Sequence, residues 1–380
     1  MVAGVKVRGP FTGPSGYAHH VREFVRALVA KEVPVQLENF ADWSPVHLPR
    51  ELREPWFESL TAPVDATAVL HFCFPNQVQP EPGRANVNFT MFEATRIPAT
   101  WVVAHDRSDL IVVPTEHSRR AWIDSGVPES KLRLCPLGVR SDLFRPDVRP
   151  LRLTGTTGRP LQSYAVRFLN VSELGARKNL TGLLRAWLRA TTTEDDAVLI
   201  MKLGAYNAGS LAEWQFTVQN VERQAGKRLD QAAPVHFIYD LLPDADMPRL
   251  FAIATHYVSL SYGEGWDLSM IEAAATGLRL IAPRHSAYLA YLDDDVATLI
   301  PTRETPALNA AGAWVSPLFT DASWWVPDEN KAVEHLRKAI DGNDTPRASA
   351  RDSVSERFSW DRATHSLIEI LEEAEAIACR

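Results

Sequence analysis

The sequence predicts an α/β fold with two parallel sheets, each covered by helices on both faces. Short apolar segments alternate with amphipathic helical patterns and polar loops along the chain, which is typical of such sheets. The length of 380 residues is more than one core normally organises and suits two domains. Residues 149–165, rich in Gly, Thr, Pro and Arg, read as a linker. We therefore expect one domain over residues 1–148 and a second over 166–359.

The first domain is expected to begin with a strand, a glycine-rich loop and a helix. The strand is Val2–Val7, the loop is GPFTGPSG at residues 9–16, and the helix runs from about Tyr17 to Ala30. Such a turn can hold phosphate or sugar, and a plain tight connection explains it equally well. Further strands are expected at Val33–Phe40, Ala68–Phe74, Asn86–Phe92, Leu110–Pro114 and Leu132–Pro136.

Glu93 is the candidate site residue that residue patterns single out in the first domain. It follows the strand expected at Asn86–Phe92, and ligands of parallel sheets sit beyond the carboxyl ends of strands. Polar Thr90, Thr95 and Arg96 lie beside it in the sequence. A helix cap or a surface ion pair is the competing interpretation.

The second domain repeats the alternation of strands and helices. An amphipathic helix is expected at Leu180–Ala190, and an aromatic, irregular segment at Trp314–Pro327. His285 and Ser286 follow the last expected strand, again at a carboxyl end. Strands are expected at Arg167–Val171, Ala197–Leu203, Val235–Tyr239, Tyr257–Leu260 and Leu278–Ala282, and further helices at Glu329–Ile340, Arg347–Arg357 and from Trp360 onward.

Arg177 and Lys178 lie on the polar loop expected at Ser172–Asn179, just ahead of a helix. One interpretation is a solvated pair of basic residues. The other is a clamp on a diphosphate, because Arg offers a bidentate fork and Lys a point charge against a negatively charged leaving group.

The segment Ser261–Pro283 combines a glycine-rich loop, a helix and a strand. Gly263 and Gly265 flank Glu264 on the loop and allow it conformations closed to other residues. Glu272 lies on the helix that follows. Two carboxylates beside the N–H groups of a helix start suit a ligand with both phosphate and hydroxyl groups, such as a nucleotide sugar.

The ends of this helix have recognisable signals. Asp267 or Ser269 can cap its start, and Gly277 can end it before the next strand.

Composition argues against several classes of protein. The net charge of −7 gives no basic excess of the kind expected of nucleic-acid binders, and no apolar stretch reaches the roughly 20 residues of a membrane span. Cys73, Cys135 and Cys379 match no zinc or redox motif, and Asp293–Asp295 reads as a turn. We expect a cytoplasmic protein with free thiols and no bound metal.

Several motifs in the right order resemble retaining glycosyltransferases of family 4, which have the GT-B fold of two Rossmann-like domains facing across a cleft. Glu264 and Glu272 match the family's Glu-x7-Glu motif. The segments Leu174–Asn179, Tyr239–Phe251 and Leu110–Phe144 resemble the family's basic loop, its base-pocket segment and the end of its first domain. Phe358-Ser359-Trp360 resembles the start of its final helix, which implies that residues 360–380 complete the first domain.

The resemblance implies a role for each matching residue. Glu272 would bind the ribose hydroxyls of the donor nucleotide, and Glu264 would lie near the donor sugar. Arg177 and Lys178 would neutralise the leaving diphosphate without a metal or other cofactor. The remaining residues implied in donor binding are Gly265, Trp266, Asp267, Leu268, Ser269, Gly13, Gly16, Asn179, Tyr239 and Leu241.

Two positions depart from the family pattern. Asp267 stands where many relatives have glycine, which adds charge and bulk near the donor sugar. Glu93 stands where many relatives have histidine and resembles an acidic subgroup, so it joins Glu264, Arg177 and Lys178 among the expected catalytic residues.

The resulting expectation is transfer of a sugar from a nucleoside-diphosphate sugar to an acceptor hydroxyl, with retention of configuration. An epimerase-like GT-B enzyme, a dinucleotide-dependent oxidoreductase and a catalytically silent binding module are the alternatives. The dinucleotide fingerprint that the oxidoreductase would need is missing from the sequence. The donor's base and sugar stay open. So does the acceptor, which can be a saccharide, a small metabolite, a protein, a lipid-linked group or a modified nucleic acid.

Overall fold

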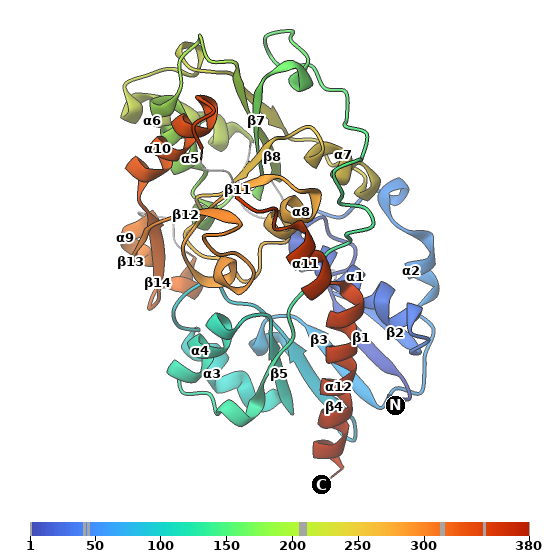
Figure 1. The fold of residues 1–380 in the computed structure, drawn as a ribbon. Helices are drawn as coiled ribbons and strands as arrows, with labels where there is room; N and C mark the ends of the chain where they lie inside the picture. Colours follow the sequence, from blue (N-terminus) through green and yellow to red (C-terminus); the bar gives the residue numbers. More distant parts are fainter. Residues whose placement is uncertain are drawn as a thin grey trace. The chain divides into compact units, whose positions relative to one another are not determined.

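The computed structural model describes residues 2–40, 43, 46–204, 211–311, 316–344 and 347–379, and the chain divides into two compact units (Figure 1). Met1–Gly138, Ser316–Ser323 and Arg357–Arg380 form the first unit. Val139–Val315 and Trp324–Glu356 form the second.

The first unit is built on a parallel sheet of six strands in the order β2-β1-β3-β4-β5-β6. Its two central strands are buried throughout, as expected of strands covered on both faces. Most of their side chains are apolar, and His71, Asn86 and Asn88 are the buried polar ones. The strands are β1 (Val5–Gly9), β2 (Val35–Asn39), β3 (Ala68–Phe72), β4 (Ala85–Phe89), β5 (Leu110–Val113) and β6 (Leu132–Leu134).

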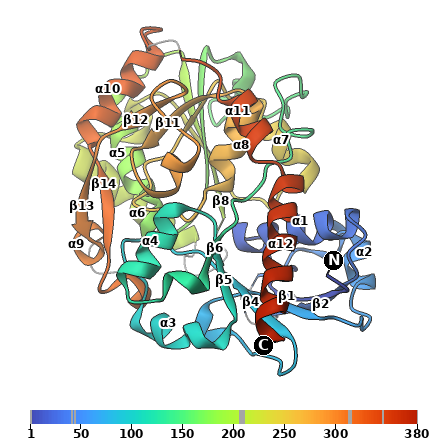
Figure 2. The same ribbon diagram turned by 60° about the horizontal axis from the view of Figure 1, so that its bottom comes forward.

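Helices cover this sheet, and the last helix of the chain is among them. Figure 2 shows α12 (red) running beside α1 over the strands of the first unit. Thr115 caps α4 by accepting a hydrogen bond from the N–H of Ser118 at 3.0 Å. The helices are α1 (Gly16–Ala30), α2 (Pro55–Ser59), α3 (Ala99–Ala104), α4 (Glu116–Asp124) and α12 (Trp360–Ala378).

The second unit has its own parallel sheet of six strands in the order β12-β11-β10-β7-β8-β9. Its core lies between the sheet and its helices, around Phe168, Trp187 and Leu199. The strands are β7 (Val166–Glu173), β8 (Ala197–Gly204), β9 (Val235–Ile238), β10 (His256–Val258), β11 (Arg279–Pro283) and β12 (Ala297–Ile300). The helices are α5 (Leu180–Ala190), α6 (Leu211–Ala225), α7 (Met247–Phe251), α8 (Leu268–Thr276), α9 (Ala307–Ala311), α10 (Glu329–Ile340) and α11 (Arg351–Arg357).

The fold class predicted from the sequence is confirmed, and several local predictions are wrong. Strand β7 continues through Ser172 and Glu173, because both keep pairing with β8, so the basic loop starts later than expected. Two features were not predicted from the sequence: strand β12, and the two-stranded sheet of β13 (Thr302–Pro306) and β14 (Ser323–Pro327). Part of the segment predicted to be irregular is therefore a strand, whereas its first residue, Trp314, lies outside the described residues. Helix α11 begins at Arg351 instead of Arg347.

Residues 149–165 are hydrogen-bonded within the second unit. The N–H of Leu151 donates to the carbonyl of Arg249 at 3.0 Å, and Thr154 pairs with Pro160 across a short turn. The guanidinium of Arg159 lies over the ring of Tyr164, 4.0 Å from its centroid. These contacts order the segment against its own unit.

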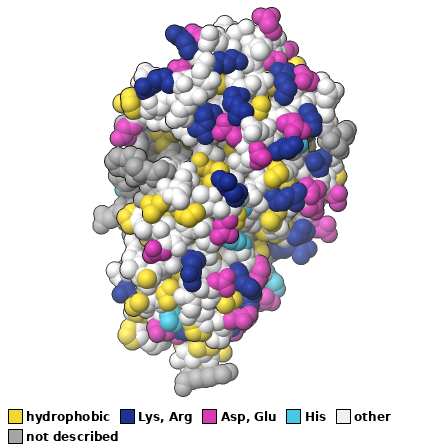
Figure 3. Space-filling model, turned by 90° about the vertical axis from the view of Figure 1, so that its left-hand side faces the viewer, with side chains coloured by type: hydrophobic (Ala, Val, Ile, Leu, Met, Phe, Trp, Pro, Cys, Tyr) yellow, Lys and Arg dark blue, Asp and Glu magenta, His cyan; other side chains and the backbone are white. Residues whose placement is uncertain are grey.

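One face of the protein carries mixed charge (Figure 3). On the face shown in Figure 3, Lys and Arg side chains alternate with Asp and Glu. Such mixing agrees with the absence of a basic excess in the composition.

Gly138 allows the start of α12 to pack closely against the first unit. A Cβ at Gly138 would lie 2.3 Å from the backbone nitrogen of Trp360, closer than atoms can approach. We expect Gly138→Ala to lower the free energy of unfolding of the first unit by about 1–3 kcal/mol, the usual cost of overpacking. Chemical denaturation followed by tryptophan fluorescence measures this.

Gly16→Ala is the matched control for this prediction. A Cβ at Gly16 meets nothing within 4 Å. Equal stability of the two variants would contradict the close packing of Gly138.

Candidate functional site

The candidate site lies in the second unit at the carboxyl ends of β7 and β10. These strands pair directly, with Phe168 opposite His256 and Leu169 opposite Tyr257. Their pairing brings the loop after β7, which carries Arg177 and Lys178, beside the loop after β10, which carries Glu264. Residues 86 or more positions apart in the sequence thereby come into contact.

Arg177 and Lys178 both form ion pairs with the carboxylate of Glu264. Arg177 Nη1 lies 2.7 Å from Glu264 Oε2, and Lys178 Nζ lies 2.8 Å from Oε1. Arg177 Nη1 also donates to the carbonyl of Gly263 at 2.6 Å. Glu264 is 3% exposed. The solvated-pair interpretation of Arg177 and Lys178 is therefore wrong, because both cations bind one buried carboxylate.

The charges of the two cations keep Glu264 ionised. Burial alone would raise the pKa of the Glu264 carboxyl. The Arg177 guanidinium and the Lys178 ammonium outweigh burial and hold this pKa well below its ordinary value. The cluster thus holds two cations beside one buried carboxylate, and cations so placed can stabilise an anionic ligand.

Asn179 fixes the end of the loop that carries Arg177 and Lys178. Its backbone is left-handed, with φ 47° and ψ 41°, and its side-chain oxygen caps α5 by accepting from the N–H of Gly182 at 3.1 Å. Its amide nitrogen donates to the carbonyl of Leu260 at 2.9 Å, so the side chain ties the two loops together. These contacts give Asn179 a structural task in addition to the donor-binding role expected of it.

Asp267, and not Ser269, caps helix α8. It adopts a left-handed backbone with φ 65°, and its Oδ1 accepts a hydrogen bond from the N–H of Met270 at 3.3 Å. Its Oδ2 accepts from the hydroxyl of Tyr288 at 2.7 Å. Burial and the nearby Glu264 carboxylate raise the pKa of Asp267. Two carboxylates of opposite pKa shift thus stand side by side in the site.

Buried tyrosine hydroxyls form hydrogen bonds with the segment from Ser259 to Asp267. They were not predicted from the sequence. The hydroxyl of Tyr288 lies 2.8 Å from Ser259 Oγ and 3.0 Å from Ser261 Oγ. The hydroxyl of Tyr291 donates to the carbonyl of Trp266 at 2.9 Å. Tyrosines spaced three residues apart just after a buried strand are the only signal that points to them in the sequence.

The other expected donor-binding residues of the second unit lie on or around α8 and β9. Glu272 is buried on α8, Gly265 is buried ahead of the helix, and Leu268 and Ser269 in its first turn are half-buried. Trp266 is buried, and its ring packs against Tyr291 with centroids 5.3 Å apart. Tyr239 follows β9, an edge strand of the sheet, and is 38% exposed. Leu241, two residues later, is half-buried.

Lys202 is a further cation that the sequence analysis missed. It lies on β8 two residues before the carboxyl end of the strand and is buried. Burial lowers its pKa, and the carboxylate of Asp240 opposes this shift. Its place inside an apolar run hid it, because such a run predicts only a buried strand.

The expected residues of the first unit lie on loops at the carboxyl edge of its sheet. Gly13 is buried and its carbonyl accepts a hydrogen bond from Arg22 at 2.8 Å, whereas Gly16 is exposed and begins α1. Glu93 is half-buried after β4. Burial raises the pKa of the nearby Tyr17 phenol, and the Glu93 carboxylate contributes in the same direction.

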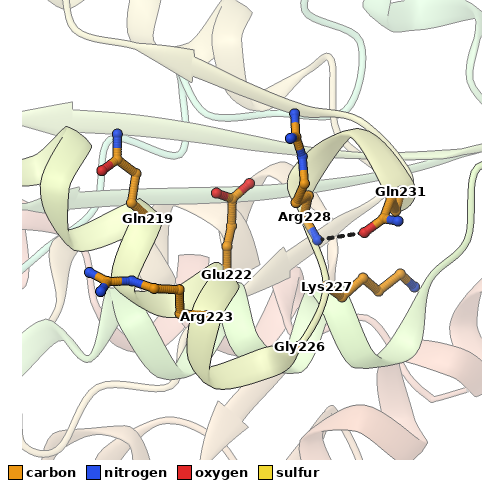
Figure 4. Close-up of a pocket in the computed structure, with 7 residues that line it drawn as sticks. All are labelled: Gln219, Glu222, Arg223, Gly226, Lys227, Arg228 and Gln231. Atoms are coloured by element: carbon orange, nitrogen blue, oxygen red, sulfur yellow. Dashed lines mark hydrogen bonds between the residues drawn. The ribbon is translucent and has the colours of Figure 1, made fainter.

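A separate hollow of about 520 Å³ lies near the end of α6 (Figure 4). None of the residues predicted from the sequence line it. Its Arg228 pairs with Asp230 at 2.7 Å, which occupies a charge that could otherwise bind a ligand. The residues that line it are Gln219, Glu222, Arg223, Gly226, Lys227, Arg228 and Gln231.

Neither a metal cluster nor a membrane helix is found in the described part of the chain. No three His, Cys, Asp or Glu side chains among the described residues come together as metal ligands would. Within the same residues, no helix is both long and apolar enough to cross a bilayer.

The chain is similar in structure to several glycosyltransferases. HepE from Anabaena, solved with UDP and glucose, aligns with a TM-score of 0.60 over 98% of this chain and 100% of its own, at 13% identity. Sucrose-phosphate synthase from Thermosynechococcus elongatus gives a TM-score of 0.65 over 98% and 99%, at 14% identity. The fold is GT-B.

A third GT-B neighbour agrees with the first two. The α,α-trehalose-phosphate synthase (UDP-forming) from Burkholderia xenovorans, solved with glucose-6-phosphate, has a TM-score of 0.64 over 97% of this chain and 100% of its own, at 14% identity. The sequence itself matches none of the protein-family models and none of the curated proteins. At identities this low, the structural similarity establishes the GT-B fold of the chain alone. The chemistry has to be argued from the residues of the site.

The left-handed backbone at Asp267 predicts an unusual order of stability. Asp267→Ala and Asp267→Gly both lose the helix cap and the bond to Tyr288, but only alanine keeps a Cβ that clashes in this conformation. We expect the Ala variant to be less stable than the Gly variant by about 1 kcal/mol. Thermal and chemical denaturation of the two proteins measure the difference.

Ser269 provides the matched control on the same helix. Within a helix glycine is the less stable residue by about 1 kcal/mol, so Ser269→Gly should fall below Ser269→Ala. The same order at both positions would contradict the left-handed conformation of Asp267.

Proposed function

We propose that this chain is a glycosyltransferase that moves a sugar from a nucleoside-diphosphate sugar to an acceptor hydroxyl, with retention of anomeric configuration. The observation that carries the proposal is the pair of cations, Arg177 and Lys178, held on Glu264 at the carboxyl ends of the second sheet. The GT-B neighbours support it, since HepE was solved in complex with UDP and glucose. The Glu264-x7-Glu272 spacing favours family 4.

The chemistry requires stabilisation of negative charge on the leaving group and positive charge on the sugar. As the bond between the anomeric carbon and the phosphate oxygen breaks, its electrons pass to the diphosphate, where Arg177 and Lys178 offset the charge. The acceptor oxygen bonds to the anomeric carbon from the same face, and its proton passes to the departing phosphate oxygen. The ionised Glu264 supports the oxocarbenium-like sugar or holds its hydroxyls. The proposal assigns neutralisation to the two cations and includes no metal.

The remaining residues receive supporting roles in this proposal. Glu272 binds the ribose hydroxyls of the nucleotide, and Tyr239 and Leu241 lie at the base. Backbone groups from Gly265 to Ser269 hold the diphosphate or the sugar. From the first unit, the proposal keeps Gly13 and Gly16 as donor-binding residues and Glu93 as a catalytic residue. We place the reaction in the cytoplasm, and the acceptor class stays open.

The proposal predicts different kinetic defects for the carboxylate and the cations. Glu272→Ala should weaken donor binding about 10- to 100-fold, because a charged hydrogen bond to the ribose is lost. Arg177→Ala and Lys178→Ala should each lower kcat about 100-fold or more, because charge stabilisation in the transition state is lost. Calorimetric titration with nucleoside diphosphates and assays of nucleotide release with each nucleotide sugar measure both.

Arg228→Ala serves as control, since it removes an exposed arginine of the same unit. It should leave kcat and donor affinity unchanged. Donor binding without transfer to any acceptor would favour a silent binding module, and conversion of the sugar without transfer would favour an epimerase. Unchanged kinetics in all three site variants would refute the assignment.

A further inference from the structure

The geometry points to Ser286 and His285 as positioning residues for Glu264. Both follow β11, which pairs with β10, so they stand beside the loop that carries Glu264. Neither belongs to the ion cluster or to the residues expected to touch the donor. For its kinetic readout the inference rests on the proposed glycosyltransferase function, and it adds residues to that same site.

A chain of hydrogen bonds links the two residues to both ends of the Glu264 loop. The N–H of Glu264 donates to Ser286 Oγ at 3.2 Å, and Ser286 Oγ lies 2.7 Å from His285 Nδ1. His285 Nε2 lies 2.8 Å from the carbonyl oxygen of Ser261. The chain therefore closes a ring around residues 261–264.

The carbonyl of Ser261 fixes the direction of one of these hydrogen bonds. A carbonyl only accepts, so His285 Nε2 carries a hydrogen. In the tautomer with its hydrogen on Nε2 alone, Nδ1 accepts from the hydroxyl of Ser286, and Ser286 Oγ keeps a lone pair for the N–H of Glu264. One imidazole in this tautomer thus links both ends of the loop.

Other segments hold the backbone between these two ends. The N–H of Tyr262 donates to the carbonyl of Arg177 at 2.8 Å, and the carbonyl of Tyr262 accepts from the N–H of Trp325 on β14 at 2.8 Å. The ring of Trp325 also stacks on His285 with centroids 5.4 Å apart. Strand β14, which was not predicted from the sequence, thereby packs against the hydrogen-bonded pair of His285 and Ser286.

The backbone of Ser286 is held in an unfavourable conformation. Its φ of 39° lies in the left-handed region, which side chains other than glycine, asparagine and aspartate rarely enter. Such strain persists where surrounding contacts over-determine it and is concentrated at functional sites. Here the contacts that hold it are the bonds to His285 and Glu264.

The hydrogen bonds of Ser286 and His285 are important because the carboxylate of Glu264 must contact two cations at once. The carboxylate oxygens lie within 2.8 Å of Arg177 and Lys178, and a small shift of the loop would break one of these contacts. Misplacement of a reacting group by about 1 Å can cost about 100-fold in rate. Ser286 and His285 therefore act through Glu264, as positioning residues, without contact to the substrate.

Ser286→Ala and Ser286→Gly test the inference together. Both remove the hydroxyl, and only glycine relieves the left-handed backbone, so the pair separates the hydrogen bond from the strain. We expect kcat to fall about 10- to 100-fold in both, with the KM for the donor within about twofold. His285→Ala should behave alike, whereas His285→Gln, whose amide can reach the Ser261 carbonyl, should retain more activity. Ser163→Ala, an exposed serine of the same unit, is the control.

A crystal structure of Ser286→Gly supplies a readout that needs no activity. In that structure we expect the Glu264 carboxylate to lie beyond hydrogen-bond distance from Arg177 or from Lys178. Glu264 unmoved in that structure, or full kcat in Ser286→Gly, would overturn it. If the wild-type protein turns over no nucleotide sugar, the proposed function fails, and the crystal structure alone still decides whether Ser286 positions Glu264.

Discussion

The site depends on keeping one buried carboxylate charged. An isolated carboxylate buried as deeply as Glu264 would take up a proton, because desolvation disfavours the ion. Arg177 and Lys178 reverse this preference from two directions, and removal of either would leave an incompletely compensated buried charge. Adjacent strands must therefore deliver both cations and the carboxylate to one point, and the pairing of β7 with β10 does so.

Local backbone conformations provide the accuracy that this arrangement needs. Asn179, Asp267 and Ser286 all occupy the left-handed region, and all three surround the ion cluster. Each is held by side-chain hydrogen bonds, to the start of α5, to the start of α8 and to the Glu264 loop respectively. Asparagine and aspartate enter this region more readily than serine, so Ser286 is the strained residue of the three, and such strain is concentrated where a protein fixes geometry for function. The hydrogen bonds that hold the cluster come from the protein alone, which is the preorganisation that electrostatic catalysis requires.

Much of the fold could be predicted from the sequence, because parallel strands buried on both faces leave continuous apolar runs. Helices α5 and α10 were predicted with their observed bounds, since each has a clear amphipathic period and a capping residue. The β13–β14 sheet was not, because its aromatic residues lack an alternating pattern and pack against a distant loop. The extension of β7 was missed because Ser172 and Glu173 are polar.

The sequence by itself determined that Glu264, Arg177 and Lys178 lie on loops after strands, where ligands of parallel sheets bind, and that Glu272 lies on the helix after Glu264, since both follow from local pattern. Only the tertiary structure decided that both cations share the carboxylate of Glu264, that Asp267 caps α8 instead of Ser269, and that the loop is clamped from behind. These facts depend on contacts between segments far apart in the chain. Hydrogen bonds across strands have no periodicity in the sequence that could reveal them.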